Sequence, residues 1–123
     1  MSTLNTFLVE DSLMIREELI GALEELAPIE VVATAEDENS AVDWLLHHPC
    51  DLVVIDVFLK SGSGVGVLRR AREMDRKMTL VVLTNYATPT MRHACLDLGA
   101  TKVFDKSTEL DELIEYCVDL AES

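Results

Sequence analysis

The sequence predicts an α/β fold in which a parallel sheet is covered by helices on both of its faces. Short, nearly continuous apolar runs recur along the chain, as is typical of strands buried on both faces of a parallel sheet. Segments with helical periodicity lie between and after these runs. Strand and helix therefore alternate five times, which is the pattern of a doubly wound sheet.

The five predicted strands are short and rich in Val, Leu, Ile and Phe. They cover residues 6–9, 31–34, 52–55, 80–83 and 102–104. No apolar run reaches the roughly 20 residues that a membrane-spanning helix requires. We therefore expect these segments to form the buried sheet of a water-soluble domain.

The five predicted helices show apolar residues spaced three and four positions apart, which places them on one helical face. The faces are Ile15, Leu19, Leu23 and Leu26; Ala41, Trp44 and Leu45, with His48 as the next position; Val67 or Leu68 with Ala71 and Met74; Met91, Ala94, Cys95 and Leu98; and Leu110, Leu113, Ile114, Cys117 and Leu120.

Helix boundaries are marked by local signals. Thr88 before Pro89 predicts an N-cap followed by proline in the first turn. Thr108, with Asp111 three residues later, resembles a capping box. Gly99 is the predicted C-terminal stop of the fourth helix.

Composition limits the classes of function. A chain of 123 residues fits one domain, and its 10 basic against 23 acidic side chains give a net charge of −13. This charge argues against binding nucleic acid or an anionic membrane. Cys50, Cys95 and Cys117 form no metal-binding or disulfide pattern, and the N-terminus lacks a secretory signal, so we expect a reduced, cytoplasmic protein.

The residues that end the predicted strands carry the chemistry. Glu10 and Asp11 follow the first strand, Asp56 the third, Thr84 the fourth and Lys106 the fifth. Ligands of open parallel sheets bind at the carboxyl ends of the strands. With the strand order 2-1-3-4-5, these five side chains would lie together.

Such a cluster indicates phosphoryl chemistry. Three neighbouring carboxylates repel one another without a cation, and oxygen ligands suit a hard ion such as Mg²⁺. A lysine and a hydroxyl beside that ion complete a set that binds a phosphoryl group. Asp56, on a central strand, is the candidate nucleophile. Taken alone, Glu10 and Asp11 could instead simply begin the first helix.

At these positions the chain resembles the receiver domain of two-component response regulators and is similar to single-domain chemotaxis regulators. The matching segments are Phe7-Leu8-Val9-Glu10-Asp11, Leu52-Val53-Val54-Ile55-Asp56, Val81-Val82-Leu83-Thr84, Gly99-Ala100 and Phe104-Asp105-Lys106. The resemblance implies a flavodoxin-like (βα)5 fold. We expect residues 1–123 to form one receiver domain without an output domain.

The resemblance also implies a phosphoacceptor and a metal site. Asp56 would accept a phosphoryl group from a sensor histidine kinase or a histidine phosphotransfer protein. Glu10, Asp11, Asp56 and the backbone carbonyl of Phe58 would hold Mg²⁺ or Mn²⁺. The chain would then be no enzyme beyond its own metal-dependent phosphorylation and dephosphorylation.

Three further residues take roles from the resemblance. Lys106 and the Thr84 hydroxyl would contact the phosphoryl oxygens. Phe104 matches the aromatic residue that rotates between exposed and buried positions as Thr84 moves. Such domains are two-state switches whose equilibrium the phosphoryl group shifts, and the change alters contacts with other proteins.

The loop after Asp56 departs from the family pattern. Lys60 stands where the family often has proline, and Ser63 where it often has aspartate. Gly62, Gly64 and Gly66 fall in or beside this loop. We therefore expect the loop to be more mobile than usual.

Four other positions bear on access to the phosphate. Asn85 replaces a small residue and would narrow the approach of a phosphodonor. Ser107 replaces a proline, which removes one expected constraint on Lys106. Phe58 and Tyr86, each two residues beyond a site residue, are bulky, and we expect them to slow self-dephosphorylation by restricting water.

The last helix suggests what the domain contacts. It carries six acidic residues and no basic one: Glu109, Asp111, Glu112, Glu115, Asp119 and Glu122. The dimer of winged-helix regulators needs a basic residue there, so the sequence favours a monomer or weak homodimer. These acidic residues could simply form a solvated helix face. Alternatively, they could contact a partner protein that has a basic or apolar groove. The identity of the downstream target is open.

Three alternatives stay open from the sequence. The first is a pseudo-receiver, which uses the same fold as an interaction module without phosphorylation. The second is a haloacid-dehalogenase-type phosphatase, which would want an acidic residue where Phe58 stands. The third is a flavodoxin, but Glu10 and Asp11 stand where a flavin phosphate loop would begin.

Overall fold

The computed structural model describes residues 3–123, and strands and helices alternate along them. The strands are β1 (Leu4–Val9), β2 (Ile29–Ala35), β3 (Leu52–Ile55), β4 (Thr79–Thr84) and β5 (Lys102–Asp105). The helices are α1 (Leu13–Leu26), α2 (Glu38–His47), α3 (Gly64–Glu73), α4 (Pro89–Asp97) and α5 (Leu110–Ala121). Each predicted element is present.

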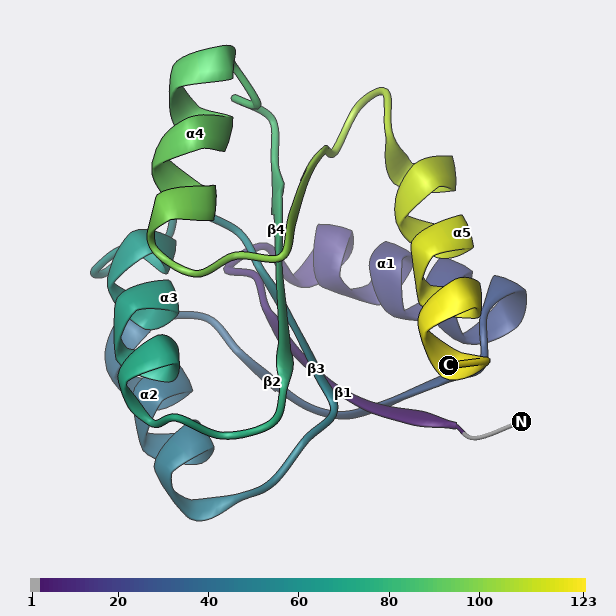
Figure 1. The fold of residues 1–123 in the computed structure, drawn as a ribbon, viewed down its shortest axis with the longest axis horizontal. Coiled ribbons are helices and arrows are strands. Elements are labelled where there is room, and N and C mark those ends of the chain that lie inside the picture. The colour runs from purple at the N-terminus through teal and green to yellow at the C-terminus, as the bar shows by residue number, and fades with distance from the viewer. Residues whose placement is uncertain (1–2) are drawn as a thin grey trace.

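The strands form one parallel sheet in the order β2-β1-β3-β4-β5 within the described chain. This confirms the predicted fold class and strand order. Helices α2, α3 and α4 lie on one side of the sheet, and α1 and α5 on the other (Figure 1). Among residues 3–123, no helix is both long and apolar enough to cross a bilayer.

Each face of the sheet has its own apolar core. Phe7, Val53 and Val82 point toward α2, α3 and α4, while Leu8 and Val54 point toward α1 and α5. Because side chains alternate along a strand, adjacent residues of β1 and β3 serve opposite cores. The continuous apolar runs follow from this two-sided burial.

Strand β2 is longer than the predicted run of residues 31–34. It lies at an edge of the sheet, and its residues alternate between covered and exposed positions. The residues of β2 outside the predicted run are Ile29, Glu30 and Ala35, and the polar Glu30 is one of its exposed positions. Central strands leave continuous apolar runs, whereas the alternation of an edge strand leaves only a shorter run.

Two predicted helix boundaries are confirmed. The Thr88 side chain accepts a hydrogen bond from the Met91 N–H at 3.1 Å, with Pro89 in the first turn of α4. Gly99 follows the C-cap with φ of 111°. Its N–H donates to the carbonyl of Leu96, as expected at the stop of a helix.

The capping box predicted at Thr108 is wrong. Helix α5 begins at Leu110, and Glu109 precedes it without a side-chain cap. The Asp105 carboxylate instead accepts hydrogen bonds from the N–H groups of Ser107 and Thr108, at 2.8 and 3.2 Å. Asp105 therefore organises this turn before the helix starts.

Three positions of the predicted helix faces are exposed in the structure: Leu26, His48 and Ala94. Leu26 is exposed because it is the last residue of α1, where the chain turns toward β2. His48 lies outside α2 as its C-cap and stacks on Trp44, which in turn stacks on Phe7. Trp44 is thus a packing residue, as its periodic position predicted.

The three cysteines are free thiols that pack against the two apolar cores. Cys95 and Cys117 are fully buried, and Cys50 is partly buried. Burial raises the pKa of Cys117 to about 12, and burial together with the nearby Asp51 raises that of Cys50 to about 11. Their thiols therefore stay protonated and unreactive near neutral pH.

Candidate functional site

Strand register brings the predicted site residues to one edge of the sheet. Val9 pairs with Ile55, so Glu10 and Asp56 leave their strands side by side. The N–H of Asp56 donates to the carbonyl of Val9 at 2.9 Å. The sheet thus aligns residues that lie 46 positions apart in the sequence.

The same edge receives Thr84 and Lys106. Thr84 ends β4 opposite Asp105 of β5, and the N–H of Lys106 donates to the Thr84 carbonyl at 2.9 Å. All five side chains predicted from the strand ends therefore belong to one edge of the sheet. The second strand ends beside this edge as well, where the Ala35 carbonyl accepts a hydrogen bond from the Glu10 N–H at 2.9 Å.

Three carboxylates gather at this edge. Oxygen atoms of Glu10, Asp11 and Asp56 lie within 4.8 Å of one another. Glu10 is almost completely buried, Asp56 is buried and Asp11 is partly exposed. Burial raises the pKa of Glu10, although its hydrogen bond from Lys106 acts in the opposite direction. Such a group of like charges needs a cation.

Lys106 supplies a positive charge within the cluster. Its Nζ donates a hydrogen bond to Oδ2 of Asp56 at 2.8 Å and another to Oε1 of Glu10. Burial acts to lower the pKa of Lys106, but the two hydrogen bonds together with the charge attraction of Asp56 and Glu10 outweigh it, and the pKa is raised. The ammonium group therefore stays charged and compensates both buried carboxylates.

The donor set fits Mg²⁺. The cluster offers only carboxylate oxygens, which a hard divalent cation prefers, and Asp11 opens it toward solvent. The backbone of Phe58 lies close by, because its N–H donates to Oδ1 of Asp56 at 3.3 Å. Gly64 is required beside this point, since any side chain there would overlap the Asp56 carbonyl.

The loop after β4 lies against the lysine side of the site. Thr84 is buried, and its hydroxyl oxygen accepts a hydrogen bond from the Tyr86 N–H at 3.2 Å. Oδ1 of Asn85 accepts a hydrogen bond from the Ser107 hydroxyl at 3.1 Å. This hydrogen bond joins the loop after β4 to the loop after β5.

Two aromatic rings stand at the rim of the site. Phe58 and Tyr86 pack edge to face with their ring centroids 4.8 Å apart, and both rings are at least half exposed. They come from the loops after β3 and β4, which carry Asp56 and Thr84. Their influence on water stays a prediction.

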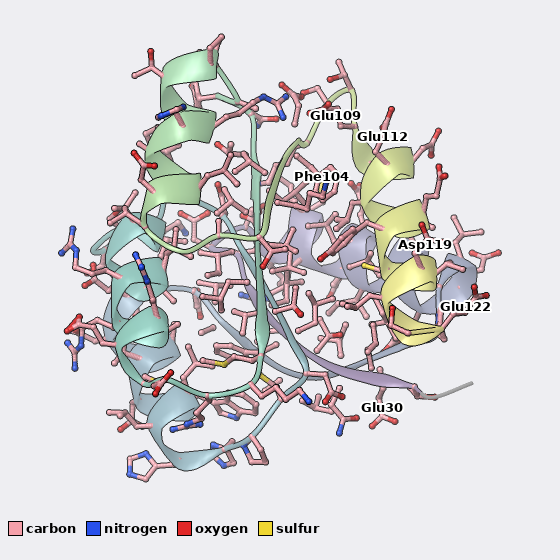
Figure 2. The ribbon with its side chains drawn as sticks, in the orientation of Figure 1. Glu30, Phe104, Glu109, Glu112, Asp119 and Glu122 are labelled. Atoms are coloured by element: carbon pink, nitrogen blue, oxygen red, sulfur yellow. The ribbon has the colours of Figure 1, made fainter. Side chains whose placement is uncertain are left out.

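Phe104 is buried between β5 and α5 in this structure (Figure 2). Its ring centroid lies 6.1 Å from that of Tyr116 on α5. Of the two orientations that the resemblance implies for this residue, the structure shows the buried one.

Sequence reasoning missed two residues that hold Glu10. The Ser12 N–H donates to Oε2 of Glu10 at 3.0 Å, and Ser12 also caps α1. Nη1 of Arg16 donates to the Glu10 carbonyl at 3.1 Å. Serine directly before an apolar helical face is an N-cap signal that could have revealed the first of them.

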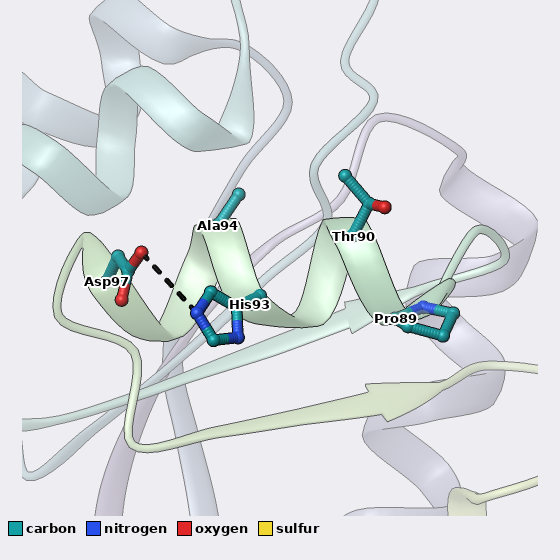
Figure 3. A pocket seen from close by; sticks show the side chains of 5 residues that line it. All are labelled: Pro89, Thr90, His93, Ala94 and Asp97. Carbon is teal, nitrogen blue, oxygen red and sulfur yellow. Dashed lines mark ion pairs between the residues drawn. The ribbon is translucent and has the colours of Figure 1, made fainter.

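Two pockets differ in their relation to this site. One of about 240 Å³ is lined by Asn85 and Lys106 together with residues of α1 and α5, so it adjoins the cluster. Another, of about 510 Å³, lies along the outer face of α4, where His93 is 4.0 Å from Asp97 (Figure 3). It shares no residue with the acidic cluster.

Comparison with known proteins agrees with this geometry. The model of the response regulator receiver domain family matches residues 6–117. The chain is 39% identical over 117 residues to protein-glutamate methylesterase/protein-glutamine glutaminase 2 of Syntrophomonas wolfei, covering 94% of the chain and 34% of that protein. It is 34% identical over 83 residues to the transcriptional regulatory protein DltR of Streptococcus agalactiae, covering 68% and 37%.

Solved structures show the same fold. The receiver domain of the putative regulator NarL from Mycobacterium tuberculosis superposes with a TM-score of 0.88 at 20% identity, covering 100% of this chain and 99% of that one. A LuxR-family response regulator from Aurantimonas gives 0.89 at 25% identity, covering 98% and 86%. The chain spans about a third of the length of the two sequence relatives above. It belongs to the response regulator receiver domain family of two-component signalling.

Proposed function

We propose that the chain is a phosphorylation-activated switch in which Asp56 accepts a phosphoryl group in a Mg²⁺-dependent reaction. One observation carries this proposal: Lys106 bridges two buried carboxylates, Glu10 and Asp56, beside a third carboxylate from Asp11. A buried lysine held on a nucleophilic carboxylate is the arrangement that a transferred phosphoryl group requires.

The reaction forms one bond and breaks another. A carboxylate oxygen of Asp56 attacks the phosphorus of a phosphohistidine on a kinase or phosphotransfer protein. A P–O bond forms and the P–N bond breaks, which leaves an aspartyl phosphate. Mg²⁺, when bound by Glu10, Asp11, Asp56 and the Phe58 carbonyl, supplies positive charge to the phosphoryl oxygens.

Lys106 and Thr84 stabilise the product. Lys106 Nζ already donates to Oδ2 of Asp56, so a short movement would let it donate to a phosphoryl oxygen. The Thr84 side chain would do the same by moving its hydroxyl toward the phosphate. That movement would alter the packing around Phe104 and pass the change to the surface of β5 and α5.

The output of the switch is a contact with another protein. Exposed acidic residues line α5, among them Glu112 and Asp119 (Figure 2). Lys102 lies 5.9 Å from the Tyr116 ring on the same surface. We propose that this surface favours a partner with a basic or apolar groove over nucleic acid or a membrane.

The test is the intact mass after incubation with acetyl phosphate and Mg²⁺. We expect a gain of about 80 Da, one phosphoryl group on a carboxylate nucleophile. The gain should be absent in Asp56→Asn and when Mg²⁺ is chelated. An Asp111→Asn variant, which changes an exposed aspartate of α5, should label as the unmodified chain does.

Absence of the adduct would call for a second donor, a phosphorylated histidine phosphotransfer protein. Transfer from that protein to Asp56 would support the proposal, because a small donor can fail where Asn85 narrows the approach. Failure with both donors would contradict it. The pseudo-receiver, an interaction module that works without phosphorylation, would then be the better description.

A further inference from the structure

Glu38, the first residue of α2, reaches into the loop between β3 and α3. Its Oε1 accepts a hydrogen bond from the Ser63 N–H at 2.8 Å. Its own N–H donates to the Ser61 carbonyl at 3.2 Å. Backbone and side chain of one residue therefore hold the far end of the loop that follows Asp56.

Two glycines make room for this contact. At Gly62, where φ is 77°, an added methyl group would lie 2.8 Å from Oε1 of Glu38. At Gly66 an added methyl group would lie 2.5 Å from Cδ of the same side chain. The glycines noted in the sequence thus allow α2 to approach the loop, a role distinct from mobility.

The contact continues to the phosphoacceptor through the backbone. Ser63 forms an antiparallel bridge with Phe58, so the two ends of the loop lie side by side. The Ser63 hydroxyl also accepts from the Val65 N–H at 3.0 Å and begins α3. Phe58 in turn donates its N–H to Oδ1 of Asp56.

We propose that Glu38 is a positioning residue that fixes the backbone of Phe58 beside Asp56. The inference rests on the proposed function, because it assigns Glu38 to the loop that would supply a metal-binding carbonyl. A carboxylate that accepts from a backbone N–H forms a strong, charge-assisted hydrogen bond. Its loss would let the Phe58–Ser63 bridge open and would move that carbonyl out of place.

The experiment compares Glu38→Ala, Glu38→Gln and the matched control Glu36→Ala, which removes an exposed carboxylate two residues away. Amide hydrogen exchange at Phe58 and Ser63 is measured by NMR in the metal-free protein, and Mg²⁺ affinity by calorimetry. In Glu38→Ala we expect faster exchange at both amides and about tenfold weaker Mg²⁺ binding, as for other residues that orient metal ligands.

Glu38→Gln should retain most of the affinity, because its amide oxygen can still accept from Ser63. Glu36→Ala should behave as the unmodified chain. Gly66→Ala offers an independent route, since its methyl group would displace the Glu38 carboxylate. Gly66→Ala should therefore reproduce the effects of Glu38→Ala. The inference can then still be tested if Glu38→Ala folds poorly.

Two outcomes would overturn the inference. One is a Glu38→Ala protein with unchanged Mg²⁺ affinity and unchanged exchange at Phe58, even if its melting temperature falls. The other is a Glu38→Gln protein as impaired as Glu38→Ala, which would show an effect of charge alone. If the unmodified chain takes up no phosphoryl group, the proposed function fails, while the exchange data still decide the role of Glu38.

Discussion

Lys106 compensates the negative charge of two buried carboxylates in the site. Its ammonium group is nearly buried and is held by both Glu10 and Asp56. Removing one member of such a buried group leaves an uncompensated charge, which is far more costly than never burying the group. The cluster is therefore already arranged around positive charge before a metal or a phosphoryl group arrives.

Phe58 and Tyr86 lead to a prediction about the lifetime of the phosphoryl group. Their rings contact each other at the rim of the site, where water must pass to hydrolyse an acyl phosphate. The double variant Phe58→Ala, Tyr86→Ala should shorten the phosphoryl half-life several-fold, as measured by the decay of the phosphorylated mass. Leu96→Ala, which truncates an exposed apolar residue of α4, serves as control. An equal or longer half-life in the double variant would contradict the idea.

At the scale of elements, Arg92 joins α4 to the loop that carries Lys106. Its guanidinium donates to the carbonyls of Ala87 and Val103, at 3.0 and 2.8 Å, and to the Glu109 carboxylate. Glu109 also accepts from the Asp105 N–H at 2.9 Å. One ion pair thus ties α4, the end of β5 and the start of α5 together.

This ion pair leads to a pH-dependent stability. The hydrogen bond from Arg92, followed by that from the Asp105 N–H, lowers the pKa of Glu109 below its ordinary 4.5. Because the folded pKa is lowered, the stabilisation is present above pH 4.5 and is lost as the pH falls through the folded value. Glu109→Gln should therefore reduce the free energy of unfolding at pH 7 by on the order of 1 kcal/mol or less, as for a partly exposed pair.

Urea unfolding at a series of pH values measures this effect. The difference between Glu109→Gln and the unmodified chain should disappear as the solution becomes more acidic than pH 4.5. Glu112→Gln removes an exposed carboxylate from the first turn of α5, the helix that follows Glu109, and should show a smaller difference at neutral pH. A difference in Glu109→Gln that persists in acid would show that packing, not the ion pair, is responsible.

At the scale of the whole molecule, cations can stabilise the fold in two ways. They screen the net charge of −13, and they can bind specifically at the carboxylate cluster. Mg²⁺ that binds only the folded chain should raise the free energy of unfolding by about 2.7 kcal/mol at a hundred times its Kd. Thermal unfolding with and without Mg²⁺ measures this. Potassium chloride at the same ionic strength gives the general screening effect, which must be subtracted.

The Mg²⁺ effect should depend on the cluster. Asp11→Asn should lose the specific stabilisation, whereas Asp111→Asn should keep it. Asp11 is the more exposed carboxylate of the three, so its change disturbs the core least. If Mg²⁺ stabilised all three proteins equally beyond the potassium control, the cluster would not be the binding site.

The sequence by itself determined the fold class and the five strand-end residues that would meet at one edge, while the strand order 2-1-3-4-5 entered as a premise that the structure confirmed. It could do so because strands buried on both faces leave continuous apolar runs, and because parallel strands place all their carboxyl ends on one edge. The caps at Thr88 and Gly99 were equally visible, since each acts within a few residues of the chain. Signals of this kind are local or repeat at a fixed period.

Only the tertiary structure decided which groups pair across elements. The bridge from Lys106 to Glu10 and Asp56, the Arg92–Glu109 pair and the reach of Glu38 into the loop after Asp56 join distant segments. Their partners are ordinary charged residues that carry no local pattern. Which groups form hydrogen bonds depends on their proximity in space, and spacing along one segment of the sequence does not reveal that proximity.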